Sequence, residues 1–157
     1  MRFGLPPLCV FRLMTEIDFT VPIQPIGKGR PRFSTISGHP VAYTPARTKE
    51  AEKVFRLYAR RAMGNQYPFD RKIPLRVSVK AFFEVPKSYS KERRERCLSG
   101  QEFPTKKPDA DNIEKFVLDG MNETIFWDDV QVIDLHITKA YTPDHGRIEV
   151  HCEVLDD

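Results

Sequence analysis

Apolar and polar residues alternate in several stretches of the chain, and this period of two predicts half-buried β-strands. The first stretch covers residues 16–23, where Pro22 indicates a sheet edge or a strand end. The second covers residues 75–85. The last two are expected around residues 130–138 and over residues 148–154. Strands are therefore expected near both ends of the sequence, with helices between them.

Apolar residues spaced three to four apart predict helices in the intervening segments. Thr44 is expected to cap a helix whose first residue is Pro45 and which runs to about Met63. Ser90 is expected to cap a short, highly charged helix that ends at Gly100. A further helix is indicated by an apolar face formed by Ile113, Phe116, Val117, Gly120 and Met121.

The order of these elements predicts an α+β fold, a single domain with helices packed on a mixed or largely antiparallel sheet. Residues 24–43 are rich in proline and glycine, so an extended loop is expected there. Residues 1–15 lack periodicity and are interpreted as an N-terminal extension, possibly without fixed structure. The domain itself is expected to cover residues 16–157.

Size and composition narrow the class of protein. A chain of 157 residues fits one domain, and 40% hydrophobic with 30% charged residues excludes a disordered or low-complexity chain. Apolar runs are far shorter than the roughly 18 residues of a transmembrane helix. The three cysteines are too widely spaced for a zinc ribbon or a disulfide framework, which predicts a reducing, cytoplasmic location.

Charge is unevenly distributed along the chain. Residues 1–107 carry 22 basic and 9 acidic side chains, whereas residues 108–157 carry 3 basic and 13 acidic ones. Basic segments attract polyanions, and clusters of carboxylates hold divalent metals. The distribution favours a protein that binds nucleic acid with one part and does metal chemistry with another, although two solvated faces of opposite charge would also explain it.

The acidic part contains a compact motif. If Asp109 and Asp111 lie in an extended stretch, they point the same way and can offer two carboxylates to one cation. Lys115 is four residues from Asp111 and four from Asp119, so these three share a helix face. A further acidic pair, Asp128–Asp129, follows the helix where the chain turns back into a strand.

Such residues suit phosphodiester hydrolysis. A metal held by carboxylates activates water and neutralises charge on the phosphoryl oxygens, and a nearby ammonium group stabilises the transition state. The alternative is structural: Asp111 or Asn112 caps the helix, Lys115 forms an ion pair with Asp119, and the acidic pair is an ordinary turn. Spacing alone leaves both interpretations open.

The combined motifs resemble the RusA family of Holliday junction resolvases, small endonucleases of phages and prophages. The resemblance covers about residues 17–154. It depends on KKPDADNIEKFVLDGMN, WDDVQV and TKAY, and extends to GKGRPRF, AYTPARTK and FFEVPKS.

The resemblance implies a homodimeric enzyme that resolves four-way DNA junctions in recombination and repair. It implies Asp109, Asp111 and Asp129 as metal-binding catalytic aspartates, with Asp128 as an acidic neighbour. Lys115 matches the catalytic lysine, and Asp119 is expected to support the site through an ion pair. The implied cofactor is Mg²⁺, or alternatively Mn²⁺, with no organic cofactor and no membrane partner.

DNA contacts are expected mainly from the segment GKGRPRF. Its basic residues Lys28, Arg30 and Arg32 can contact phosphates, and Phe33 can stack on a base or wedge into a junction. Lys106–Lys107, just before the acidic motif, completes this DNA-binding set. The alternatives are that this segment is only a mobile basic loop, or that Phe33 is a buried anchor.

The leading hypothesis is therefore a magnesium-dependent endonuclease selective for four-way junctions. A non-catalytic DNA-binding protein would use the same basic residues but show no metal requirement. A nuclease that acts on other branched DNA would share the aspartates, because they do not encode the choice of substrate.

Overall fold

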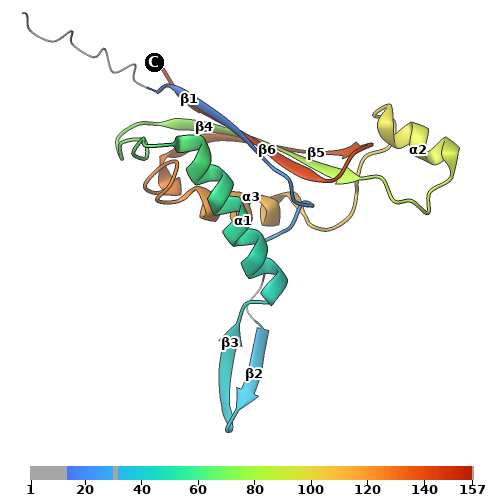
Figure 1. The fold of residues 1–157 in the computed structure, drawn as a ribbon, viewed down its shortest axis with the longest axis horizontal. Coiled ribbons are helices and arrows are strands. Elements are labelled where there is room, and N and C mark those ends of the chain that lie inside the picture. The colour runs from blue at the N-terminus through green and yellow to red at the C-terminus, as the bar shows by residue number, and fades with distance from the viewer. Residues whose placement is uncertain (1–13, 30–31, 157) are drawn as a thin grey trace, which may run out of the picture.

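The computed structural model describes residues 14–29 and 32–156, and its elements follow the α+β order expected from the sequence (Figure 1). In chain order they are β1 (Glu16–Val21), β2 (Arg32–Ile36), β3 (His39–Tyr43), α1 (Ala46–Met63), β4 (Leu75–Glu84), α2 (Lys91–Leu98), α3 (Ala110–Met121), the 3₁₀ turn η1 (Asp129–Gln131), β5 (Val132–Thr142) and β6 (Arg147–Val154). Residues 1–13 of the expected N-terminal extension lie outside the described residues.

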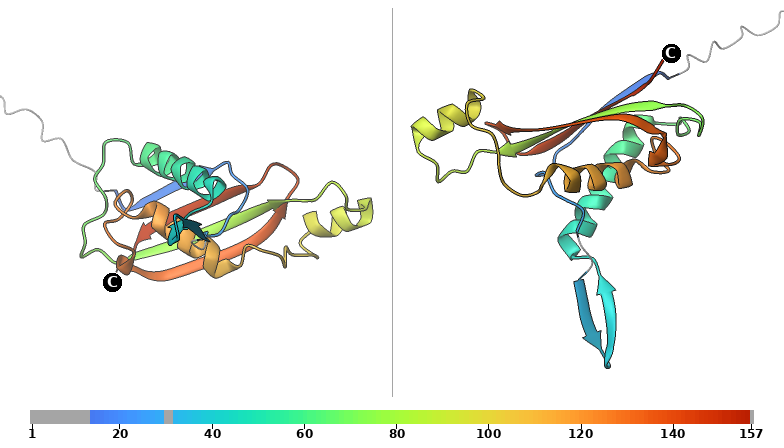
Figure 2. Two further views of the ribbon diagram at one scale, coloured as in Figure 1. Left: turned by 90° about the horizontal axis from the view of Figure 1, so that it is seen from below. Right: turned by 180° about the vertical axis from the view of Figure 1, so that it is seen from behind.

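The main sheet has the strand order β1-β6-β4-β5, and β4 is parallel to β5 while the other neighbours are antiparallel. The predicted mixed sheet is thus confirmed. Helices α1 and α3 cover the same face of this sheet, as the views from below and behind show (Figure 2). β1 forms one edge, in agreement with Pro22 at its end.

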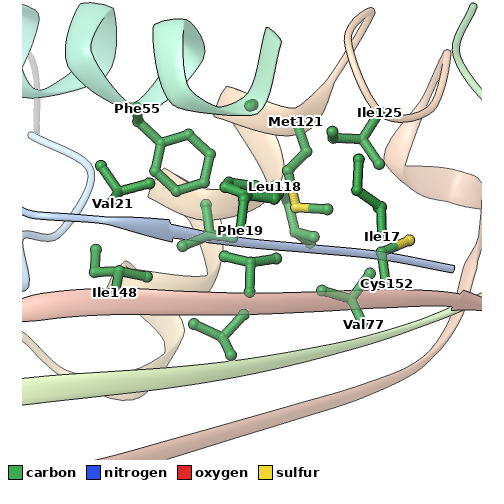
Figure 3. Close-up of a cluster of buried hydrophobic side chains, with 14 of the residues drawn as sticks. Ile17, Phe19, Val21, Phe55, Val77, Leu118, Met121, Ile125, Ile148 and Cys152 are labelled. Carbon is green, nitrogen blue, oxygen red and sulfur yellow. The ribbon is translucent and has the colours of Figure 1, made fainter. Parts of the chain in front are cut away.

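The core lies between this sheet and the two helices (Figure 3). The ring of Phe55 from α1 packs edge-on against Phe19 of β1 at 5.6 Å and against Phe116 of α3 at 5.5 Å between ring centroids. A Cβ atom at Gly120 would overlap the Phe55 ring, so this glycine allows α1 and α3 to approach closely. Burying a side chain of this size contributes roughly 1.5–3 kcal/mol, which fixes α3 on the sheet.

Two helix ends follow the expected signals. Gly64 ends α1 with a positive φ of 58°, and the hydroxyl of Ser90 accepts a hydrogen bond from the Arg93 amide at 3.3 Å at the start of α2. The predicted cap at Thr44 is wrong, because the N-cap is Pro45. Its ring fixes φ at −52°, but its ψ of 139° is extended, so the helix starts one residue later.

The extended loop expected at residues 24–43 is also wrong, since β2 and β3 form an antiparallel hairpin within it. Ser37 and Gly38 both have positive φ, 52° and 81°, as a tight two-residue hairpin turn requires. The hairpin extends away from the main sheet at the start of α1 (Figure 1).

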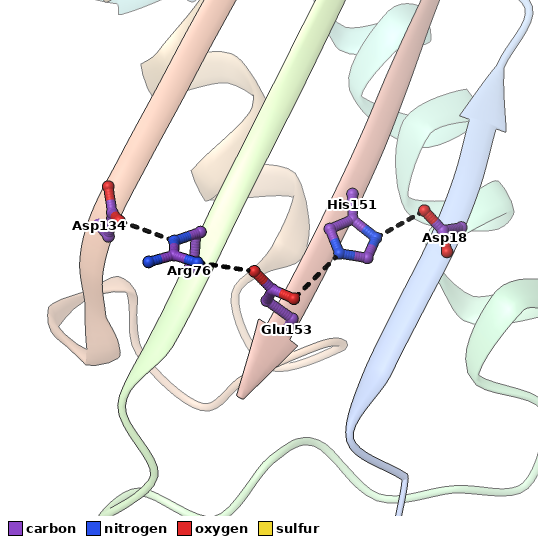
Figure 4. A network of polar contacts seen from close by, with 5 residues as sticks. All are labelled: Asp18, Arg76, Asp134, His151 and Glu153. Carbon is purple, nitrogen blue, oxygen red and sulfur yellow. Dashed lines mark hydrogen bonds and ion pairs between the residues drawn. The ribbon is translucent and has the colours of Figure 1, made fainter. Parts of the chain in front are cut away.

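The face of the sheet opposite the helices carries a ladder of polar contacts across all four strands (Figure 4). Arg76 joins Asp134 at 2.7 Å and Glu153 at 3.0 Å, and His151 joins Glu153 at 3.5 Å and Asp18 at 2.7 Å. These groups are partly solvated, so screening by water keeps each pair weak.

None of the helices in the described part of the chain is long and apolar enough to cross a membrane. Cys97 and Cys152 are buried and carry free thiols.

Candidate active site

The predicted catalytic residues of the acidic motif lie along one exposed side of α3. The opposite side of the helix is buried against the sheet, so Asp111, Lys115 and Asp119 point away from the core. The Lys115 ammonium is 3.9 Å from the Asp111 carboxylate, one turn away. The polar residues on this exposed side, together with Asp109, are called here the acidic stripe.

The geometry at the start of the stripe differs from the expected one. Asp109 is the N-cap of α3 with extended backbone angles, whereas Asp111 already lies in the first helical turn. The two carboxylates therefore do not alternate along an extended stretch, and neither Asp111 nor Asn112 is the cap. Both carboxylates lie at the N-terminal end of the helix, where the exposed backbone amides stabilise negative charge.

The acidic pair lies at the other end of the stripe. Asp128 caps η1 by accepting a hydrogen bond from the Val130 amide at 3.1 Å, and Asp129 is the first residue of this turn. Partial burial raises the pKa of Asp129, and the neighbouring carboxylates of Asp128 and Asp119 raise it further, while a hydrogen bond from Asn122 lowers it. Several negative groups are thus crowded where α3 ends.

The structure does not gather the predicted metal ligands into one tight cluster. Asp109 and Asp111 lie at the start of α3, whereas Asp128 and Asp129 follow its end, and a helix of 12 residues is about 18 Å long. Across the described residues, no three of the four predicted aspartates place carboxylate oxygens within 4.8 Å of one another. The group that meets this distance, Glu16, His151 and Glu153, lies at the polar ladder on the opposite face of the sheet. The ligand roles of the aspartates stay a prediction.

The donor atoms nevertheless fit a hard divalent cation. All of them are oxygens, and the crowding around Asp129 leaves negative charge that a cation would neutralise. The side-chain oxygen of Asn122 is buried beside this group without a hydrogen-bond partner. Mg²⁺ and Mn²⁺ prefer such oxygen ligands.

Gln131, which the sequence analysis did not single out, holds the acidic pair in place. Its buried side-chain amide donates to the carbonyl oxygens of Asp70 at 2.8 Å and Ile73 at 3.2 Å. Its side-chain oxygen accepts from the backbone amides of Trp127 at 3.1 Å and Asp128 at 3.3 Å. Asp128 and Gln131 form a capping box, and their spacing in WDDVQV is the sequence signal for it.

Lys28, expected to bind DNA, lies instead against the acidic stripe. Its ammonium is 2.8 Å from the Asp119 carboxylate and 3.1 Å from that of Glu52 on α1. The hydrogen bond to Asp119 raises the pKa of Lys28 despite partial burial. The backbone amide of Lys28 also donates to the carbonyl oxygen of Asn112 at 3.1 Å. The expected ion pair of Asp119 therefore exists, with Lys28 as its partner rather than Lys115.

Lys139, from the motif TKAY, is a second residue that the analysis missed. Its ammonium donates to the carbonyl oxygen of Lys106 at 2.6 Å. Burial lowers the pKa of Lys139, the charge of Lys106 lowers it further, and the charge of Asp109 opposes this shift. The N-terminal end of the stripe thus combines carboxylates with basic side chains.

The remaining DNA-binding candidates are exposed where the structure describes them. Lys106 and Lys107 lie in the segment that leads into α3, and Arg32 and Phe33 lie on β2. The alternative of Phe33 as a buried anchor is wrong, because its side chain is largely exposed. Arg30 lies outside the described residues.

Comparison with known proteins gives matches over the same region. The sequence model of the family "Endodeoxyribonuclease RusA" matches residues 22–153. "Uncharacterized protein YqaN" of Bacillus subtilis (strain 168) is 37% identical over 141 residues, an alignment that covers 87% of this chain and 95% of that protein. The range matched by the family includes the hairpin, α3 and η1.

Proposed function

Because this chain belongs to the RusA family of endodeoxyribonucleases, as its motifs predicted, we propose that it resolves four-way DNA junctions by metal-dependent hydrolysis of paired phosphodiesters. The observation that carries this proposal is the acidic stripe of α3, with Lys115 on its exposed side and crowded carboxylates at the Asp129 end.

In this proposal Asp109 and Asp111 at the start of α3, and Asp128 and Asp129 beyond its end, supply oxygen ligands for Mg²⁺, or alternatively Mn²⁺. The bound cation supplies a more acidic water and neutralises charge on the phosphoryl oxygens. Partial burial raises the pKa of Asp129, and the neighbouring carboxylates of Asp128 and Asp119 add a repulsion that such a cation would relieve. Gln131 fixes the position of the Asp129 carboxylate, because its hydrogen bonds to Asp70 and Ile73 hold η1 against the segment before β4.

Basic side chains have two roles in this proposal, contact with the substrate and support of the site. The Lys115 ammonium is exposed and only 3.9 Å from the Asp111 carboxylate, so it can contact a phosphate that binds beside Asp111. A compact ammonium there stabilises negative charge on the phosphoryl group in the transition state. Lys106, Lys107 and Arg32 contact flanking phosphates. Lys28 supports the site through its ion pair with Asp119.

A four-way junction has two strands to cut, so we expect the enzyme to act as a homodimer with one acidic stripe for each strand. A two-fold axis places two identical sites on opposed strands. Such cleavage would serve recombination and repair, and the prophage setting of the family is expected here too.

A second candidate, a DNA-binding protein without catalysis, is favoured by the spread of the aspartates. In the described residues, no three of the four aspartates bring carboxylate oxygens within 4.8 Å of one another. That protein would bind junctions with steep salt dependence and would gain nothing from metal.

Cleavage of a synthetic four-way junction separates the two candidates. The wild type and Asp111→Asn are assayed with Mg²⁺ or with EDTA, and linear duplex serves as the control substrate. We expect paired, Mg²⁺-dependent cuts on the junction that fall at least about 100-fold in Asp111→Asn, with binding retained. Asp144→Asn, an exposed aspartate in the turn before β6, is the matched control and should cut normally. A folded wild type that binds the junction but cuts nothing with Mg²⁺ or Mn²⁺ would leave the second candidate.

A further inference from the structure

The β2–β3 hairpin exposes apolar side chains that the chain itself does not cover. It projects away from the sheet and helices in the two side views (Figure 1; Figure 2, right). Phe33 is 74% exposed, Ile36 60% and Val41 40%. A two-stranded hairpin without a packed face is at best marginally stable in water. Its side chains are therefore available to a partner.

These apolar side chains lie on both faces of the hairpin. Phe33 pairs with Ala42, Ser34 with Val41 and Ile36 with His39. Directly opposed residues share a face and successive residues alternate, so Phe33 is on one face while Ile36 and Val41 are on the other. A flat partner surface would cover only one of these faces. A partner that encloses the hairpin from two sides would cover both.

The positive charge of the hairpin and its flanking segments favours a polyanion as the partner. From Gln24 to Lys49 the sequence holds five basic residues and no acidic one. The basic residues are Lys28, Arg30, Arg32, Arg47 and Lys49. A second copy of the same hairpin would bring like charges together, whereas DNA neutralises them. Ribbons of two strands fit a DNA groove, and apolar side chains can enter between base steps and unstack them.

We propose that the β2–β3 hairpin enters the branch point of DNA, between two diverging duplex arms, and that Phe33 stacks on an end base pair there. Ile36 and Val41, on the other face, contact the second arm. This inference rests on the proposed function for the choice of branched DNA. It assigns recognition of the branch to a part of the chain separate from the aspartates.

The root of the hairpin ties this contact to the acidic stripe. A Cβ atom at Gly27 would lie 2.9 Å from the Cβ of Asn112, so the segment before β2 passes directly against the first turns of α3. Lys28 adds a backbone hydrogen bond to Asn112 and an ion pair with Asp119. The described segment before the hairpin is thus fixed to the helix that carries Asp111 and Lys115. A hairpin bound in the branch would therefore position Asp111 and Lys115 along the DNA strand.

The test measures DNA binding in EDTA, so that it does not depend on cleavage. Phe33→Ala and Val41→Thr are compared with the wild type on a four-way junction and on linear duplex of the same length. A 2-aminopurine at the branch reports unstacking through its fluorescence. Tyr67→Ala is the matched control, because Tyr67 is 84% exposed but follows the far end of α1.

We expect Phe33→Ala to weaken junction binding about tenfold, the effect of losing one base–aromatic stack, and to abolish the fluorescence rise. Val41→Thr, which keeps the shape of the side chain, should weaken junction binding to a smaller extent. Binding to linear duplex should stay unchanged in both variants, and Tyr67→Ala should bind both DNAs like the wild type.

Several results would overturn the inference. One is that both hairpin variants bind the junction like the wild type, or that they lose junction and duplex binding equally. Another is light scattering that shows conversion of a dimer to monomers by these variants, which would make the hairpin a contact between copies. Each outcome can be told apart from failure of the proposed nuclease, which is read from cleavage with Mg²⁺ by the unaltered chain.

Discussion

Replacing Gln131 by glutamate tests how the turn that carries the acidic pair is held. The new side chain has the same size, but the amide group that donates to the carbonyl oxygens of Asp70 and Ile73 becomes an oxygen that only accepts. Gln131 is 5% exposed, so water cannot replace the lost donor. The two carbonyl oxygens are left facing a carboxylate.

The expected loss follows from these two hydrogen bonds. Each buried hydrogen bond that is broken with one partner left in place costs about 1–2 kcal/mol, so the free energy of unfolding should fall by about 2–4 kcal/mol. For a domain of this size, 1 kcal/mol corresponds to about 2–4 °C, and Tm should fall by at least about 4 °C. The loss should shrink at low pH, because a protonated glutamate regains one donor.

Thermal unfolding followed by circular dichroism measures this difference. Gln66→Glu is the matched control, since Gln66 is exposed and the same chemical change there should alter stability by less than about 0.5 kcal/mol. If the two variants melt within about 1 °C of each other, the hydrogen bonds to Asp70 and Ile73 do not hold the turn.

Two further predictions concern pH and charge. The pKa of Asp129 is raised on folding, so its ionised form costs stability at pH values above that pKa. Asp129→Asn should therefore raise Tm at pH 7 in EDTA while abolishing cleavage. The gain in Tm should shrink as the pH falls toward about 3.9, the pKa of an unperturbed aspartate. Burial lowers the pKa of His151, but the hydrogen bonds and charges of Asp18 and Glu153 outweigh it and the net pKa is raised. The stabilisation from protonated His151 is thus fully present below about pH 6.5 and is lost as the pH rises through the raised value. Urea unfolding should show that His151→Gln loses more stability relative to wild type at pH 5.5 than at pH 8, and equal losses would contradict this.

Elements whose local pattern agrees with their environment could be predicted from the sequence. β4 alternates strictly because one of its faces is in the core, and it lies between β5 and β6. α3 shows the clearest apolar stripe because its inner side packs on the sheet while its outer side is charged. In both elements the spacing of apolar residues matches the pattern of burial.

The β2–β3 hairpin could not be predicted in this way, because burial does not shape its pattern. Neither of its faces packs on the core, and its turn is Ser37–Gly38 rather than the stronger Asn-Gly signal. Pro40 also argues against a strand, yet it is tolerated because both strands of a two-stranded ribbon are edges.

Contacts between segments far apart in the sequence could not be predicted from it either. The motif GKGRPRF identifies Lys28 as basic, but only the folded chain brings it to Asp119. In the same way Gln131 bonds to Asp70, which belongs to the segment before β4. Spacing within a motif reports on neighbours along the helix or strand, whereas these polar pairs depend on how α1, α3 and η1 pack together.

The packing of α3 also distinguishes the acidic stripe from an ordinary solvated helix face. Partial burial and the repulsion from Asp128 and Asp119 raise the pKa of Asp129, so its ionised form opposes folding, and Lys28 neutralises only part of the negative charge around Asp119. The buried side of the helix, including Ile113 and Phe116, contributes roughly 1.5–3 kcal/mol for each large side chain and holds the charges together against this repulsion. A solvated helix face has no need of crowded carboxylates, because its stability would increase if they were dispersed. Charge held together at a cost in stability is typical of a site that binds a cation and, through it, a phosphate.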